Sequence, residues 1–101
     1  MIAIKELVGH IESELKDADE YADLALHYMD DDHTLSDMYR TLANEEINHA
    51  HKEHEQAVRL INAYKRDGNE PPAAMIAVWD WEHDRMVEHE SDIKVKLSMY
   101  R

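Results

Sequence analysis

Cysteine and phenylalanine are absent from this sequence of 101 residues, and only two glycines and two prolines interrupt it. Without cysteine the chain has no disulfide, no thiolate metal site and no thiol nucleophile. The shortage of glycine, proline and aromatic residues leaves little material for a sheet, and the remaining composition favours helices. We therefore expect residues 1–101 to form a single all-α domain with one core.

Basic residues and long hydrophobic runs are also scarce. The longest apolar run, residues 73–79, is far shorter than a membrane span, and the N-terminal residues lack the pattern of a signal peptide. The chain has 23 acidic and 11 basic residues, a formal net charge of −12. Such a surface repels nucleic acid and anionic membranes and attracts divalent cations. We expect a cytoplasmic protein with no nucleic-acid or membrane partner.

Apolar residues recur at steps of three and four, which predicts helices at about residues 4–29, 35–66 and 73–99. Thr34 and Asp37 would form a capping box at the start of the second helix, and Gly68 would end it. The inward face of that helix is expected to carry a stripe of Leu35, Met38, Leu42, Glu46, His49, Glu53, Ala57, Leu60 and Tyr64.

Polar residues occupy inward positions where a helical bundle normally places apolar ones. They are Glu14 in the first helix, Glu46 and His49 in the second, and Glu82 and His89 in the third. Side chains three residues apart share a helix face, and pairing the first two helices about a turn near residue 31 places Glu14 opposite about residue 48. A buried carboxylate without partners is costly or becomes protonated, so we expect Glu14, Glu46 and His49 to share a metal ion.

The third helix leaves two alternatives open. Pairing it with the second helix about residue 69 puts His89 level with about residue 50 and Glu82 level with about residue 57. His89, and with less support Glu82, would then be additional metal ligands. Alternatively, both would satisfy each other or Glu53 in a buried polar network. His51 and His54 fall on other faces of the second helix and are expected to be solvated, although such a pair could bind Ni or Zn weakly.

The spacing Glu14-x6-Tyr21, followed by Glu45-Glu46-x-x-His49-Ala, resembles the ferritin-like superfamily. Rubrerythrins carry a very similar phrase on their second helix, and the resemblance covers about two of the three expected helices. It implies a carboxylate di-iron centre that oxidises Fe(II) with oxygen or peroxide, a ferroxidase-type activity. By the same resemblance, Tyr21 would be a nearby hydrogen-bond donor or electron source.

A full ferritin-like subunit has four helices and carries the ligand set twice, whereas this chain carries it once. The layout is similar to encapsulated ferritins, in which two subunits complete the site. The resemblance therefore implies a homodimer, or a larger assembly of dimers, whose four-helix bundle holds two ions of iron, with manganese as the alternative. Each subunit would contribute Glu14, Glu46 and His49, with Glu46 bridging the ions. Glu45 and Glu53 would guide cations or act as further ligands.

Residues 96–101 show no docking peptide of the kind carried by encapsulin cargo, so confinement in a protein shell is not expected. Two other functions remain compatible with the sequence. One is a helical structural or assembly module with a vestigial or adventitious metal site. The other is weak buffering of divalent metals by the acidic, histidine-rich surface.

Overall fold

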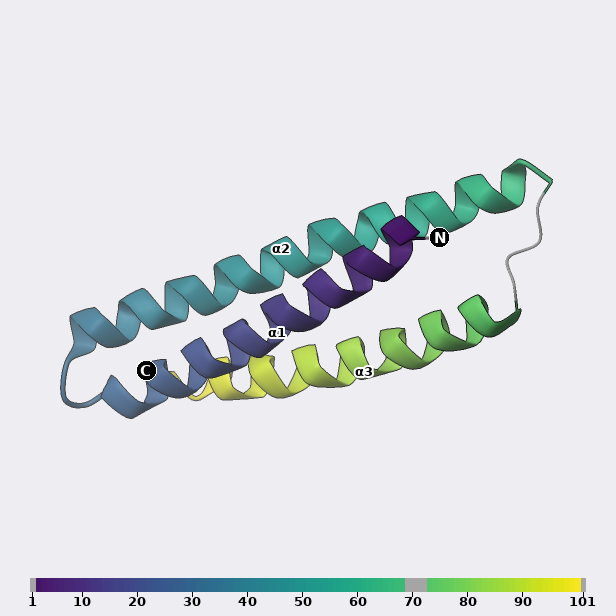
Figure 1. The fold of residues 1–101 in the computed structure, drawn as a ribbon. Coiled ribbons are helices and arrows are strands. Elements are labelled where there is room, and N and C mark those ends of the chain that lie inside the picture. The colour runs from purple at the N-terminus through teal and green to yellow at the C-terminus, as the bar shows by residue number, and fades with distance from the viewer. Residues whose placement is uncertain (1, 69–72, 101) are drawn as a thin grey trace.

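A computed structural model describes residues 2–68 and 73–100, which form three helices and no strand. They are α1 (Ile2–Tyr28), α2 (His33–Arg66) and α3 (Ala73–Ser98). The prediction of an all-α chain is confirmed, and the helix boundaries differ from the expected ones by two residues or fewer. The expected connection at 69–72 lies outside the described residues. The molecule is a rod with extents of 57 × 17 × 17 Å, in which α1 runs antiparallel to α2 and alongside α3 (Figure 1).

The turn between α1 and α2 differs in detail from the expected capping box. Asp32, not Thr34, caps α2, because its Oδ1 accepts a hydrogen bond from the backbone N–H of Leu35 at 3.1 Å. The helix begins at His33, so Thr34 is already helical and cannot act as the cap. Asp37 instead accepts hydrogen bonds from the Arg40 guanidinium, 2.9 Å away. The capping-box prediction was therefore wrong.

Gly68 ends α2 as expected. It has a φ of +79°, a left-handed conformation that costs glycine little. Its N–H donates to the carbonyl of Lys65 at 3.2 Å, which satisfies one of the carbonyls that the helix end leaves free.

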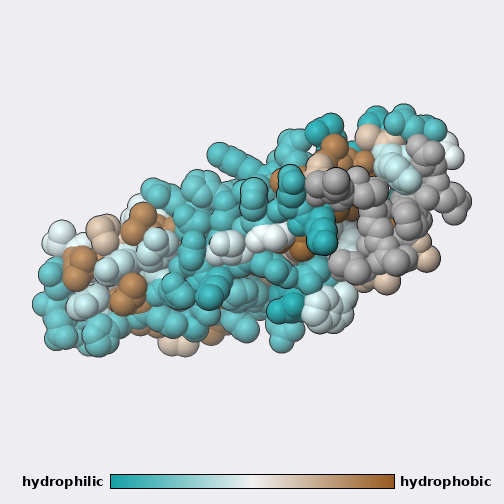
Figure 2. Space-filling view, in the orientation of Figure 1, coloured by the Kyte–Doolittle hydropathy of each residue, from teal (hydrophilic) through white to brown (hydrophobic). Residues whose placement is uncertain are grey.

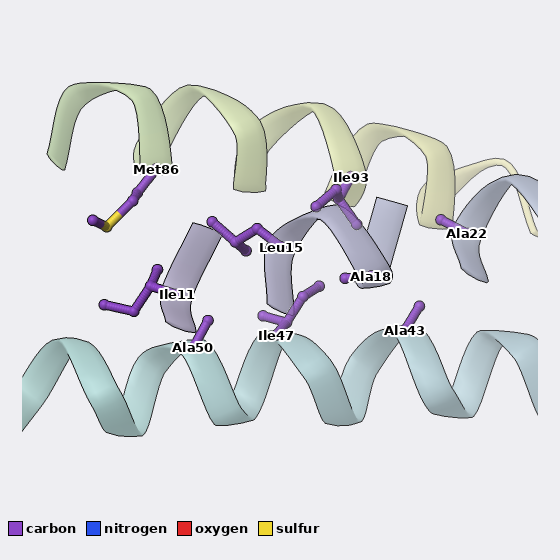
Figure 3. Close-up of a cluster of buried hydrophobic side chains, with 9 residues drawn as sticks. All are labelled: Ile11, Leu15, Ala18, Ala22, Ala43, Ile47, Ala50, Met86 and Ile93. Atoms are coloured by element: carbon purple, nitrogen blue, oxygen red, sulfur yellow. The ribbon is translucent and has the colours of Figure 1, made fainter. Parts of the chain in front are cut away.

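Small residues line the seam between α1 and α2. Ala18 and Ala22 of α1 and Ala43 of α2 are fully buried, and their short side chains let the two helices approach closely. Ser36 is also fully buried and donates a hydrogen bond from its hydroxyl to the carbonyl of Ala25 at 2.5 Å. The seam is completed by larger apolar side chains from all three helices, which Figure 3 shows: Ile11, Leu15, Ile47, Met86 and Ile93.

Most of the buried face of α2 lies one residue further along the chain than the expected stripe, and only Ala57 belongs to both. The buried residues are Ser36, Ala43, Ile47, Ala50, Ala57 and Ile61, whereas Met38, expected inside, is 46% exposed. One residue is about 100° of helix rotation. Alanines occupy the centre of the seam because close helix packing favours small side chains there. The longer Leu42 lies beside them and is half-buried. Glu46, His49 and Glu53 therefore border the seam instead of occupying its centre.

Helix α3 covers one side of the α1–α2 hairpin. Its Lys96 ammonium lies 2.5 Å from Asp19 and 2.9 Å from Asp23, both on α1, and His51 of α2 contacts Glu90 of α3. By helix rotation, Glu14 on α1 and Glu46 on α2 lie across the seam from these contacts. Within residues 2–68 and 73–100, no further helix covers the opposite side of the hairpin, which carries Glu14 and Glu46.

The buried Ile93 provides a test of how firmly α3 is docked. Its side chain is fully buried against α1, so Ile93→Ala is expected to lower the free energy of unfolding by about 2–5 kcal/mol. Val95 on the same helix is 53% exposed, so Val95→Ala should change it by less than about 0.5 kcal/mol. Urea unfolding measures both. Equal effects of the two substitutions would contradict the docking of α3 described above.

Most of the surface visible in Figure 2 is hydrophilic, with hydrophobic residues scattered across it. None of the helices in the described ranges combines the length and the apolar character needed to cross a membrane.

Candidate metal centre

Glu14 of α1 lies beside Glu46 and His49 of α2. One potential ligand atom from each of the three side chains lies within 4.8 Å of the other two. The antiparallel hairpin produces this proximity, because it places the middle of α1 level with the middle of α2 (Figure 1). Among the residues that the structure describes, this is the one group of three or more such side chains that meets this spacing.

The three side chains are less deeply placed than the sequence pattern indicated. The Glu46 side chain is 22% exposed and that of His49 is 52% exposed, and His49 Nδ1 lies 3.8 Å from Glu46 Oε1. The expectation of an inward-facing His49 was wrong within a single chain, because the alanine seam rotates α2 and leaves this residue at the edge. The packed α1–α2 seam therefore closes one side of the cluster, and the side away from α3 is open.

Glu53, two helical turns beyond Glu46, adds a third carboxylate to the cluster. Burial raises the pKa of Glu14 from its usual value of 4.5 to about 7, with further contributions from the adjacent Glu53 carboxyl and from the charges of Glu46 and Asp17. Glu14 Oε2 and Glu53 Oε2 are buried and have no hydrogen-bond partner. Such crowded carboxylates need either protons or a cation. The donor set therefore fits a hard or borderline metal ion.

The raised pKa of Glu14 makes the stability of the metal-free protein depend on pH. Since folded Glu14 keeps its proton up to about pH 7 and an unfolded glutamate loses it near pH 4.5, its contribution to stability is present below pH 4.5 and is lost as the pH rises to about 7. Metal-free Glu14→Gln should match the wild type at pH 4 and melt at a higher temperature at pH 8. Thermal unfolding at both pH values, with the exposed Glu45→Gln as control, measures this. Parallel pH profiles of wild type and Glu14→Gln would contradict it.

Glu82 and His89 do not join the cluster. Arg85 approaches Glu82 to 3.7 Å, and the pKa of Glu82 is raised first by a hydrogen bond with Glu12 and then by burial. His89 Nε2 lies 3.7 Å from Asp19 Oδ2. Both residues lie between α3 and α1, across the seam from Glu14. Glu82 and His89 therefore neither join the Glu14 cluster as ligands nor form a network with Glu53, because α3 packs against the other side of the hairpin.

Glu45 and Tyr21 lie near the cluster without belonging to it. Glu45 is exposed and projects about 100° away from Glu46 around α2. Tyr21 lies two turns beyond Glu14 on α1, is half-buried against the core, and stacks on Tyr39 of α2 with ring centroids 6.1 Å apart. The stack orders the aromatic rings on the same uncovered side as Glu14.

His54 departs from the expectation that it is solvated. Its ring stacks on Trp79 of α3 at a centroid distance of 5.6 Å, and its Nε2 is buried without a hydrogen-bond partner. Sequence reasoning missed this environment because the phase of α2 decides whether residue 54 faces α3. The sequence signal that could have indicated this environment is the placement of His51 and His54 on the second helix and of His83 on the third.

Comparison with known proteins adds no assignment: no family model matches the sequence, and no match is found among curated proteins or solved structures. The function is therefore argued from the site.

Proposed function

We propose that this chain is a ferritin-like metal-binding protein that holds two iron ions between two copies of itself and oxidises Fe(II). The observation that carries the proposal is the meeting of Glu14, Glu46 and His49 at one point on the hairpin. The buried, unpartnered oxygens of Glu14 and Glu53 support it, because a cation would satisfy both.

The need for a second copy follows from the number of donors and from the uncovered face. One chain offers the Glu14, Glu46 and His49 set once, which is too few ligands for two ions. Around the cluster, the uncovered face carries half-buried apolar and aromatic side chains: Leu7, Tyr21, Leu42, Leu60 and Tyr64. A two-fold axis through this face would pair equivalent residues. It would complete a four-helix bundle with at least four carboxylates and two imidazoles, the composition of carboxylate di-metal sites.

Each residue of the proposed site would have its own role. Glu46, central on the face, would hold the ions together with Glu14 and His49, and Glu53 would lie beside Glu14 as a further carboxylate. An oxygen-rich donor set suits iron or manganese better than zinc. Fe(II) is the substrate: two ions would give up one electron each, and the two electrons, with two protons from water, would reduce one oxygen to hydrogen peroxide or one hydrogen peroxide to two waters. Tyr21 would supply a hydrogen bond or an electron from its position two turns along α1.

Addition of Fe(II) to metal-free protein under oxygen tests this proposal. We expect oxygen consumption in proportion to the iron added, at a rate well above that of Fe(II) in buffer, together with about two bound iron ions per dimer. Metal that binds in this ratio without oxygen consumption would overturn the oxidase function.

Metal binding without oxygen consumption would favour a helical assembly module with a vestigial metal site. The exposed apolar residues of α3 are the observation in favour of such a module: Trp81, Val87 and Val95 are each more than half exposed. A third outcome, weak metal binding that survives removal of Glu14 and Glu46, would identify surface buffering and contradict both site-based functions.

A further inference from the structure

A second group of metal-binding side chains lies on the side of the hairpin that α3 covers. His51 and His54 of α2 and His83 and Glu90 of α3 line one cavity of about 170 Å³. The inner wall of this cavity is apolar and is formed by Ile11, Leu15, Ala50 and Met86. By helix rotation, this group lies across the Ala43–Ile47–Ala50 seam from Glu46 and His49, so the two groups share no side chain.

His54 is the central side chain of this cavity. Its ring lies 5.0 Å from that of His83 and stacks on Trp79, measured between centroids. Its Nε2 is shielded from water and has no hydrogen-bond partner. Leaving a buried polar atom unpaired destabilises the fold, and coordination of an ion would remove this cost. Burial, followed by the charges of His83 and His51, lowers the pKa of His54, so the ring is neutral and able to ligate at neutral pH.

His51 and Glu90 supply the remaining donors. His51 Nε2 contacts Glu90 Oε1, and the Glu90 side chain is only 21% exposed. Lys94 lies 3.2 Å from the same carboxylate oxygen. The carboxylate therefore already faces a positive group and a ring nitrogen at the rim of the cavity. An entering cation would replace these partners.

We propose that His51, His54, His83 and Glu90 form a separate binding site for one late first-row divalent metal, of which Zn²⁺ is the best fit. Three imidazoles and one carboxylate match the nitrogen-rich, four-coordinate preference of zinc. The donor atoms are more widely spaced than those of the Glu14 cluster. Rotation of the partly exposed His51 and His83 side chains would bring them onto one ion. A bound ion would join α2 to α3 directly.

Zinc titration of variants separates this site from the acidic cluster. In protein carrying Glu46→Gln and His49→Gln, we expect about one Zn²⁺ per chain to remain bound by calorimetry and metal analysis. Adding His54→Gln and His83→Gln should weaken this binding by at least about 100-fold. His27→Gln, which removes an exposed histidine, should leave it unchanged. With Co²⁺ as the probe, the visible absorption of a tetrahedral site should appear and disappear with the same variants.

Undiminished zinc affinity in the His54→Gln, His83→Gln protein would overturn the proposal, and so would an equal loss in His27→Gln. Because His54 packs on Trp79, a second pair, His51→Gln and Glu90→Gln, removes donors at the rim and leaves the apolar wall intact. This pair must also weaken zinc binding, and retention of full affinity would count against the site. Neither result depends on whether the Glu14 cluster binds iron.

Discussion

Glu46→Ala is expected to abolish iron binding and Fe(II) oxidation together. Glu46 is the carboxylate next to both Glu14 and His49, so its loss removes the central ligand of the proposed site. Removing such a ligand should cost at least about 100-fold in affinity. Oxygen consumption should fall to the rate of Fe(II) in buffer.

Glu45→Ala is the matched control for this result. It removes the same charge one residue away, from an exposed position on α2, and should leave metal content and oxygen consumption close to those of the wild type. Metal analysis and oxygen-electrode measurements on the wild type, Glu46→Ala and Glu45→Ala test this prediction. If both variants lose activity equally, the acidic surface as a whole, and not the cluster, attracts the iron.

Leu42→Arg is expected to convert the proposed dimer to a monomer and to remove iron binding without changing a proposed ligand. Leu42 lies one turn before Glu46 on the uncovered face and is half-buried in a single chain. An arginine there would place a like charge opposite itself across a two-fold axis. Sedimentation velocity should show the monomer, and the helix content by circular dichroism should stay that of the wild type.

Val95→Arg is the control for the dimer interface. Val95 is 53% exposed on the outer face of α3, away from the hairpin face that carries Glu46. This variant should remain dimeric and active. A monomeric Val95→Arg beside a dimeric Leu42→Arg would place the contact between copies on α3 and would contradict a shared metal site on the hairpin.

The sequence predicts most of the fold because few residues break the helices. The three helices and the stop at Gly68 follow from apolar spacing and from the position of glycine. The meeting of Glu14 with Glu46 follows from the short turn, which fixes the relative heights of two antiparallel helices. These features depend on local spacing, and the hydrophobic pattern records local spacing well.

The sequence does not predict which side chains face which neighbour. Met38 and Ala43 are both plausible inward residues by spacing, and only the close packing of the alanines selects the second. The resulting rotation of α2 by about 100° places His49 at the edge of the hairpin. The side on which α3 docks is also undecided by periodicity, so His89 was expected near the metal turn and instead lies by Asp19.

The most direct test of the shared iron site is metal content measured separately on monomer and dimer. Iron-loaded protein is fractionated by size under conditions where both species are present, and iron is counted per chain in each fraction. We expect about two iron ions per dimer and almost none in the monomer, because one chain supplies the ligand set only once. The same iron content per chain in both fractions would show that a single hairpin holds the metal and would contradict a site shared between two copies.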